Sequence, residues 1–344
     1  MNNKNTSKQY TAVSLFSGIG GIDLGFEQAG FRITYQCEID SFCRDILTQH
    51  WPDVPRSNNI KEVLADDVST SDVWFGGFPC QDVSVARMGP RAGLRGQRSG
   101  LFHDFARLLA EARPRVFVIE NVSGLLSSHG GSDFRCVIRT LAELGYCVGW
   151  RMLNSKDFGV PQSRSRVFLV GSYRDWRGPV EILFESERRR GYAAPGAAHG
   201  TRAVSPFKES VGDPRKGPVV QRLSYCLYAC SARHTGTDWS RTYVSYPKGR
   251  VRRLTPIECE RLQGFPEGWT QPITFDGNLD RIDTLRYQAL GNAVTVPLAR
   301  WIASRIRRYL ASCEQGITQF TDRCLEVPET EVKASSKDQL AIDF

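Results

Sequence analysis

Several features common in other classes of protein are missing from this sequence. No run of apolar residues approaches the ~18 needed to span a bilayer, and the N-terminus lacks the apolar segment of a secretory signal. The 10 cysteines are scattered at spacings that match neither a disulfide framework nor a zinc site. Glycine and proline follow no period, which excludes fibrous and repeat architectures. We therefore expect a cytoplasmic protein with reduced thiols, no membrane contact and no bound metal.

The chain has 344 residues, of which 41% are hydrophobic, so it can bury about two domain cores. Its net charge of +8 is unevenly spread. Residues 172–253 hold 16 basic and 7 acidic residues, interleaved with tyrosine and tryptophan, whereas residues 314–344 hold 3 basic and 7 acidic residues. Basic residues among aromatics are typical of nucleic-acid binding, although a solvated surface of an irregular domain has the same composition. The acidic C-terminal stretch is predicted to be a flexible tail.

Strand and helix patterns alternate along the first half of the chain. Apolar strands are predicted at 11–16, 32–37, 72–75, 115–119, 147–153 and 166–170. Helices are predicted at 22–29 and 101–112, and a later apolar face includes Leu298, Ile302 and Ile306. This alternation predicts an α/β fold with a doubly wound, mostly parallel sheet, in which ligands bind beyond the carboxyl ends of the strands.

A glycine-rich turn follows the first strand. Gly18, Gly20 and Gly21 allow the backbone to approach a ligand closely, but the third glycine of a dinucleotide fingerprint is replaced by Asp23. A nicotinamide dehydrogenase is therefore disfavoured. Such a loop suits a ligand with an ammonium and a carboxylate, such as the methionine part of S-adenosylmethionine. Glu38 ends the second strand, where a carboxylate can accept both ribose hydroxyls.

A cysteine in a turn is the strongest candidate for catalysis. Cys80 follows a predicted strand, and a lone cysteine is ordinarily a small buried hydrophobe. Here Glu120 also ends a strand, and Arg164 and Arg166 lie two residues apart, on one face if extended. Because a thiolate needs positive charge nearby, these residues together indicate a nucleophile, an acid and an oxygen clamp.

Seven short motifs along the chain resemble those of the DNA (cytosine-5)-methyltransferases and follow one another in the order typical of that family. They are FSGIGG at 16–21, Glu38, PCQ at 79–81, ENV at 120–122, QSRSR at 162–166, RLTPIECERLQGFP at 253–266 and QALGNAV at 288–294. The Pro-Pro element of amino-methyltransferases does not occur. The resemblance implies an S-adenosylmethionine-dependent methyltransferase fold with a smaller, irregular target recognition domain. The expected domains are catalytic (1–171), target recognition (172–252), recognition support and return (253–312) and tail (313–344).

The resemblance also implies roles for individual residues. Cys80 adds to C6 of a flipped cytosine, Glu120 shares a proton with N3, and Arg166, with Arg164, holds O2. The residues expected to bind S-adenosylmethionine are Phe16, Gly18, Ile19, Gly21, Glu38, Pro79, Leu101, Asn292 and Val294. Asn59 and Ile60 are also expected to contact the cofactor, because they stand where many relatives have an Asp-Ile pair. The amide oxygen of Asn59 can accept a hydrogen bond from the adenine amino group as the aspartate does.

Duplex DNA is the expected substrate, and residues 81–99 resemble a mobile lid rich in arginine and glycine. The expected DNA contacts are Gln81, Ser84, Arg87, Arg95, Arg98 and Thr255.

Residues 339–344, from Gln339 to Phe344, resemble the peptide by which bacterial replication proteins dock on the sliding clamp, or match it by chance. We expect a monomeric, bacterial or phage-encoded, nucleoid-associated enzyme of a restriction-modification system, with a cognate endonuclease, or an orphan methylase.

Two other functions fit parts of the sequence. The tRNA-cytosine methyltransferases share the chemistry, but their Cys-Phe-Thr element is not found here. A catalytically inactive DNA-binding regulator would not need Cys80, Glu120 and Arg166 together.

Overall fold

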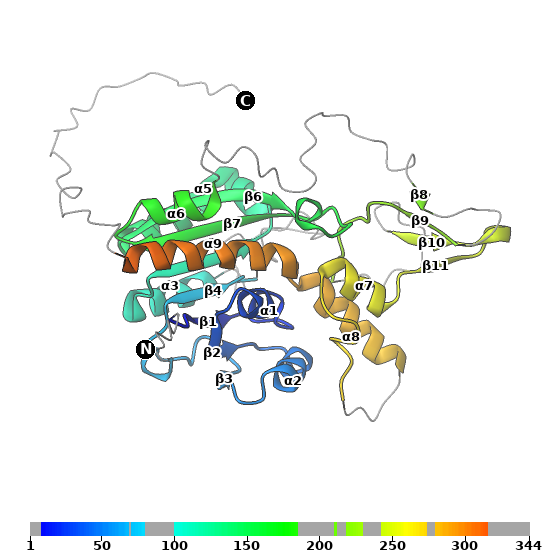
Figure 1. Ribbon diagram of the computed structural model, residues 1–344, viewed down its shortest axis with the longest axis horizontal. Helices are drawn as coiled ribbons and strands as arrows, with labels where there is room; N and C mark the ends of the chain where they lie inside the picture. Colours follow the sequence, from blue (N-terminus) through cyan, green and yellow to red (C-terminus); the bar gives the residue numbers. More distant parts are fainter. Residues whose placement is uncertain are drawn as a thin grey trace, which may run out of the picture. The chain divides into compact units, whose positions relative to one another are not determined.

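The computed structural model describes residues 8–68, 70–79, 100–184, 210–211, 218–229, 242–273 and 279–315. Its main element is a seven-stranded sheet with the order β3-β2-β1-β4-β5-β7-β6. The strands are β1 (Thr11–Leu15), β2 (Arg32–Cys37), β3 (Arg56–Ser57), β4 (Val73–Gly76), β5 (Val116–Asn121), β6 (Tyr146–Asn154) and β7 (Ser165–Tyr173). The chain moves outward from β1 in one direction to β3 and in the other to β6, so β1 and β4 flank the switch point of the sheet (Figure 1).

All neighbouring strands from β3 to β5 are parallel, whereas β7 is antiparallel to both β5 and β6. The prediction of a mostly parallel α/β sheet is therefore confirmed. Each predicted strand corresponds to an observed one, with ends that differ by a few residues. The reversed direction of β7 could not be predicted, because buried parallel and antiparallel strands are equally apolar.

Helices cover both faces of this sheet. The α-helices of the described part of the chain are α1 (Gly21–Gln28), α2 (Ser41–His50), α3 (Leu101–Ala112), α4 (Gly124–Ser127), α5 (Ser132–Glu143), α6 (Arg177–Leu183), α7 (Pro256–Gln263), α8 (Leu279–Asn292) and α9 (Val296–Glu314), of which α7 and α8 lie beside the sheet (Figure 1). Leu109 of α3 and Leu141 of α5 pack in one core with Trp74. Phe75, the next residue of β4, points to the other face and contacts Phe26 of α1 with ring centroids 4.4 Å apart. The sheet is therefore doubly wound (Figure 1).

Helix α9 packs on the same side of the sheet as α1. A Cβ atom at Gly25 of α1 would lie 2.6 Å from the Cβ of Ala299, so the two helices are in very close contact. The predicted apolar face of this helix is confirmed, because Leu298, Ile302 and Ile306 are buried. Arg305 donates to the carbonyl of Ile182 near the end of α6. Within the described part of the chain, no helix has both the length and the apolarity to cross a bilayer.

A second sheet lies within the segment predicted to recognise DNA. Its strands β8 (Ser210–Val211), β9 (Val219–Gln221), β10 (Tyr243–Ser245) and β11 (Val251–Arg253) are antiparallel, with the order β11-β10-β9-β8. The chain between β9 and β10 contacts the segment before β7, where Gln162 accepts a hydrogen bond from the amide of Leu227 at 3.1 Å. In Figure 1 this sheet lies beyond α7, away from β1 and β2.

Candidate active site

A cavity of about 890 Å³ opens at the carboxyl ends of β1, β2, β4 and β5. The residues that line the cavity include the last residues of these strands and the residues that directly follow them. Among those lining the cavity are Phe16 and Gly18 after β1, Glu38 after β2, Gly77 and Pro79 after β4, and Glu120 at the end of β5. This volume suits a cofactor-sized ligand together with part of a substrate. The location is the one expected for ligands of an open α/β sheet.

The turn after β1 has an unusual backbone that places an amide toward the Glu38 carboxylate. Phe16 and Gly18 have φ values of 58° and 56°, in the left-handed region that favours glycine. The Gly18 amide donates to Oε2 of Glu38 at 2.7 Å, and the Asp40 amide donates to Oε1 at 2.8 Å. Burial raises the pKa of Glu38, while these two bonds oppose the shift. The carboxylate is thus oriented before any ligand binds.

Apolar side chains line the cavity near Glu38. They are Phe16, Ile39, Ile60 and Leu101, and Ile39 is 75% exposed although isoleucine is usually buried. Ile39 was not predicted, and its position directly after Glu38 is the sequence signal that could have identified it. Asn59 also lines the cavity, and its Oδ1 accepts from the Lys61 amide at 3.2 Å. Because an amide oxygen has two lone pairs, one acceptor site stays available to a ligand.

Glu120 and Arg166 form an ion pair at another part of the cavity wall. The Nε of Arg166 lies 3.1 Å from Oε1 of Glu120, and the two side chains are only 17% and 12% exposed. Gly77 makes room for this pair, because a Cβ there would lie 2.9 Å from Oε2 of Glu120. The side-chain Nδ2 of Asn121 donates to the carbonyl of Phe78 at 3.3 Å, which ties the end of β5 to the chain just before Cys80.

Arg164 has a different environment from Arg166, although both line the cavity. Its side chain is buried and donates to the carbonyls of Leu227 and Gly291, at 3.0 and 3.2 Å, and to Sγ of Cys226 at 3.3 Å. Burial lowers the pKa of Arg164 to about 10, and the charge of Arg166 adds to this effect. Arg164, directly before β7, is therefore linked by hydrogen bonds to the predicted recognition segment and to α8, beside the cavity.

Two cysteines of the cavity wall are poorly suited to be nucleophiles. Burial raises the pKa of Cys37 to about 12 and the pKa of Cys43 well above its ordinary value. A thiol needs a lowered pKa to react near neutral pH. The predicted nucleophile, Cys80, lies outside the described residues, as do the predicted DNA contacts Gln81, Ser84, Arg87, Arg95 and Arg98 and the predicted clamp peptide at 339–344. Pro79, the residue before Cys80, does line the cavity.

The remaining predicted residues have other surroundings. Asn292 lines the cavity, whereas Ile19, Gly21 and Val294 are not part of its lining. A Cβ at Gly21 would lie 2.4 Å from the carbonyl oxygen of Val294, so these two residues pack together behind the turn. Thr255 is exposed and caps α7, where its hydroxyl accepts from the Glu258 amide at 3.3 Å. Direct ligand contacts of these four residues stay predictions.

A buried polar network beneath the turn was also not predicted. Asp23 has no exposed surface and accepts from Ser14 and Gln36, at 2.9 Å in each case. Burial is the largest influence on its carboxyl group and raises its pKa to about 6. A charged residue in the apolar first turn of α1 is the sequence signal that could have drawn attention to it. Among the described residues, no cluster of histidine, cysteine and acidic side chains could hold a metal ion.

Comparison with known proteins gives one consistent match. Residues 10–189 and 198–308 match the family model of the C-5 cytosine-specific DNA methylases. The Type II methyltransferase M.DsaV of Dactylococcopsis salina is 31% identical over 90% of this chain and 89% of its own length. The Type II methyltransferase M1.ScrFI of Lactococcus lactis subsp. cremoris is 31% identical over 90% of this chain and 80% of its own length.

Solved structures share the fold at lower sequence identity. The Entamoeba histolytica methyltransferase EhMeth has a TM-score of 0.62 and 16% identity, covering 88% of this chain and 99% of its own. The S. pombe Dnmt2 methyltransferase has a TM-score of 0.62 and 18% identity, over 88% of this chain and 99% of its own.

Proposed function

Because this chain belongs to the C-5 cytosine-specific DNA methylase family, we propose that it methylates C5 of a cytosine within a specific short sequence of duplex DNA. The methyl donor is S-adenosylmethionine, and the reaction proceeds through a covalent bond between Cys80 and C6 of the flipped base. The observation that carries this proposal is the cavity itself. It brings together Glu38, Pro79 and the Glu120–Arg166 pair, which come from the ends of β2, β4 and β5 and from the start of β7.

The cavity has the groups needed to hold S-adenosylmethionine. Glu38, oriented by two backbone amides, would accept the ribose hydroxyls, and the apolar side chains beside it would contact the adenine ring. Asn59 would accept from the adenine amino group through the free lone pair of its amide oxygen. When bound, this cofactor supplies an electrophilic methyl group.

The residues of the target site supply the electrons and the charge stabilisation. C5 of cytosine is too electron-poor to take a methyl group directly. The sulfur of Cys80 adds to C6, and the displaced electron pair makes C5 nucleophilic. Glu120 shares a proton with N3 and stabilises the charge that develops in the ring, while Arg166 orients Glu120 and holds O2 together with Arg164. After methyl transfer, loss of the C5 proton re-forms the double bond and expels Cys80.

Separate parts of the chain bind the DNA. Residues 81–99 act as a lid whose Gln81, Ser84, Arg87, Arg95 and Arg98 contact the DNA, and residues 172–252 read the target sequence. Thr255 contacts a phosphate from the start of α7. The base must leave the helix, because C5 and C6 cannot be reached inside a duplex. The support segment, residues 253–312, then returns the chain to the catalytic domain of residues 1–171.

A nucleoside analysis tests this function directly. The protein is incubated with S-adenosylmethionine and plasmid DNA, and the DNA is digested and examined by mass spectrometry. We expect 5-methylcytosine in the reaction with the wild-type protein and none with Cys80→Ala. If only tRNA acquires 5-methylcytosine, or if the methyl group is found on an exocyclic nitrogen, the proposed function is wrong.

The cellular setting is part of the proposal. The protein acts as a cytoplasmic monomer on nucleoid DNA, either beside a cognate endonuclease or as an orphan methylase. The Type II names of the relatives support the first setting.

Residues 339–344 recruit the protein to the sliding clamp, so their deletion should abolish clamp pull-down without changing turnover on naked DNA. An unchanged pull-down would refute clamp recruitment.

A further inference from the structure

A tryptophan from the segment after α7 reaches the turn that follows β1. The indole Nε1 of Trp269 donates to the carbonyl of Ile19 at 2.8 Å. Ile19 lies between Gly18 and Gly20, whose φ values of 56° and 79° are both left-handed. Because a chain rich in glycine has many accessible conformations, a hydrogen bond to the central peptide restricts this turn strongly.

The segment that carries Trp269 is itself fixed on both sides. The carboxylate of Glu260, on α7, accepts from the amides of Gly268 and Thr270 at 2.7 and 2.9 Å. Glu260 is completely buried and is paired with Arg286 at 3.1 Å. The two peptides that flank the tryptophan therefore cannot move without breaking a buried ion-pair network.

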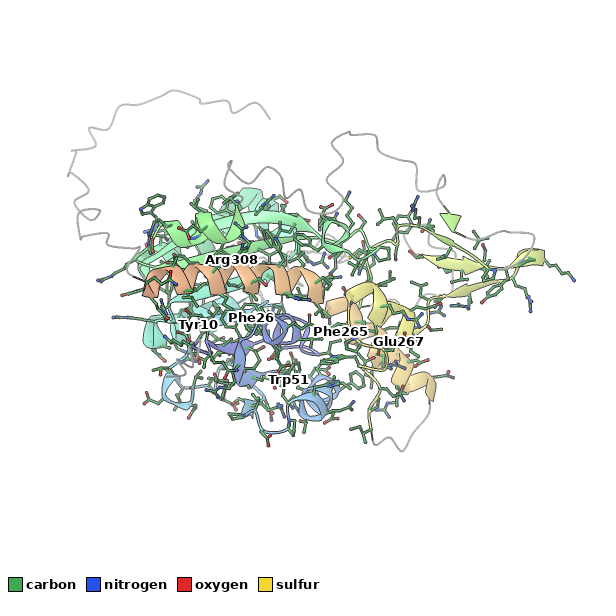
Figure 2. The ribbon with its side chains drawn as sticks, viewed as in Figure 1. Tyr10, Phe26, Trp51, Phe265, Glu267 and Arg308 are labelled. Atoms are coloured by element: carbon green, nitrogen blue, oxygen red, sulfur yellow. The ribbon has the colours of Figure 1, made fainter. Side chains whose placement is uncertain are left out.

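Aromatic rings hold the indole in place. Trp269 stacks on His50 of α2 with centroids 3.4 Å apart and planes 4° apart, and it contacts Trp51 edge-on at 5.6 Å. Trp51 also limits the turn, since a Cβ at Gly20 would lie 2.4 Å from its ring. Figure 2 shows Trp51 and Phe265 near one another beside α1, and both belong to the same buried cluster as Trp269.

The turn is thus held from two directions. Gly18 donates to Glu38 on the cavity side, and Trp269 donates to Ile19 from behind. We propose that Trp269 is a positioning residue that preorganises the cofactor turn, so that the segment following the recognition region sets the affinity for S-adenosylmethionine. This inference rests on the proposed function, because it assigns the turn to that cofactor. It also ties cofactor binding to the chain that supports DNA recognition, since α7 follows β11 directly.

The test compares two tryptophan variants of the full-length protein. Trp269→Phe keeps an aromatic ring but removes the N–H donor, whereas Trp74→Phe removes an indole from the buried core around β4. S-adenosylhomocysteine is titrated into each protein by calorimetry. We expect about tenfold weaker binding for Trp269→Phe, equivalent to about 1.4 kcal/mol, and a change within about twofold for Trp74→Phe. In steady state, KM for S-adenosylmethionine should rise about tenfold, while kcat at saturation stays within about twofold.

A glycine pair provides a second test if Trp269→Phe does not fold. Gly268 and Gly130 both have a left-handed φ, and a Cβ at either one would meet no atom within 4 Å. Alanine therefore strains the backbone equally in both, but only Gly268→Ala strains the segment that carries Trp269. We expect several-fold weaker S-adenosylhomocysteine binding for Gly268→Ala and none of this loss for Gly130→Ala.

The outcomes separate this inference from the proposed function. If the wild-type protein does not bind S-adenosylhomocysteine, both are overturned. If the wild-type protein binds but Trp269→Phe binds equally well, only the positioning role is overturned. The same conclusion follows if Trp74→Phe or Gly130→Ala loses as much affinity as its partner variant, or if kcat falls while KM is unchanged.

Discussion

The acid and the cation at the target end of the cavity depend on each other. Glu120 and Arg166 lie 3.1 Å apart and are largely shielded from water, so their attraction is weakly screened. Removing the charge of one leaves the other buried without its partner. In the proposed reaction this pair meets the base, whereas Glu38 meets the cofactor, so substitutions at the two acids should affect different steps.

Glu120→Gln should damage catalysis while leaving cofactor binding intact. An amide cannot share a proton with N3, so we expect kcat to fall about 10²–10³-fold. S-adenosylhomocysteine affinity should stay within about twofold. Methyl transfer to DNA and calorimetric titration measure these two effects. Glu111→Gln is the control, because Glu111 is exposed and pairs with Arg107 across one turn of α3. A kcat within tenfold of the wild type would show that Glu120 has no such role.

The buried carboxyl group of Asp23 should make stability depend on pH. Burial raises its pKa from 3.8 to about 6. The folded protein therefore holds this proton over a range in which the unfolded chain has lost it. The stability contribution is complete below about pH 4 and is lost as the pH rises through 6. The loss is about 3 kcal/mol relative to a side chain that does not titrate.

Asp23→Asn provides that reference. The free energy of unfolding is measured in urea from pH 4 to pH 8 for both proteins. We expect the wild type to lose about 3 kcal/mol relative to Asp23→Asn between pH 4 and pH 7, with no further change above pH 7. A difference that is the same at every pH would contradict the raised pKa.

The position of a residue could be predicted from the sequence where the signal is local. Glu38 and Glu120 could be identified because each ends or follows an apolar strand, and the structure places both at the cavity. Trp269 could not, because its partner, the carbonyl of Ile19, is 250 residues away in the sequence. The sequence singled out Asp23 only because it replaces the third glycine of the dinucleotide fingerprint. Its burial and its hydrogen bonds with Ser14 and Gln36 arise only when the strands pack, so the sequence could not show them.

Among the elements, α7 begins at a well-defined N-cap. Thr255 and Glu258 form a capping box, in which the Thr255 amide donates to Oε2 of Glu258 at 2.7 Å. Arg252 of β11 donates to both carboxylate oxygens, at 2.7 and 2.9 Å, and its hydrogen bond lowers the pKa of Glu258 to about 2. The start of this helix is therefore coupled to the small sheet.

Thr255→Ala should remove the hydroxyl half of this capping box. We expect a loss of about 1 kcal/mol and a decrease in Tm of about 2–4 °C. Thr284→Ala is the control, because Thr284 lies inside α8 and bonds only to the preceding turn, through the carbonyl of Asp280. Differential scanning calorimetry measures both variants. Equal Tm values for the two would indicate that the cap contributes nothing.

Helices α1 and α9 should tolerate no added volume where they cross. A Cβ at Gly25 would lie 2.6 Å from the Cβ of Ala299 and 2.7 Å from the backbone nitrogen of Arg300. Gly25→Ala should therefore cost about 1–3 kcal/mol, although alanine is the better helix former. Urea unfolding measures this cost. A stabilised Gly25→Ala protein would contradict the close packing.

Element-level prediction identified every strand of the main sheet except β3, but none of the second sheet. The apolar period identified helix 101–112 with the observed bounds, and β2 was also predicted with its observed ends. The four strands of the second sheet were not predicted, because each has only two or three residues. Such strands carry too little alternation to be distinguished from loops.

At the scale of the whole molecule, the order of the strands assembles the site. The cavity wall contains Phe16, Pro79 and Glu120 because β1, β4 and β5 end at the same edge of the sheet, and the end of α8 adds Asn292. The family resemblance predicted this assembly from the order of the motifs. The surface that reads DNA could not be predicted, since no general code relates an irregular segment such as residues 172–252 to a base sequence.

The central claim is that Cys80 forms a bond to C6 of a cytosine extruded from DNA. Duplex DNA with 5-fluorocytosine at the target tests it, because fluorine at C5 cannot leave as a proton does and the adduct is trapped. With S-adenosylmethionine present, we predict a covalent protein–DNA complex whose modified peptide contains Cys80, and none with Cys80→Ala. The account is contradicted if the wild-type protein forms no adduct with DNA that it methylates, or if Cys80→Ala still forms one.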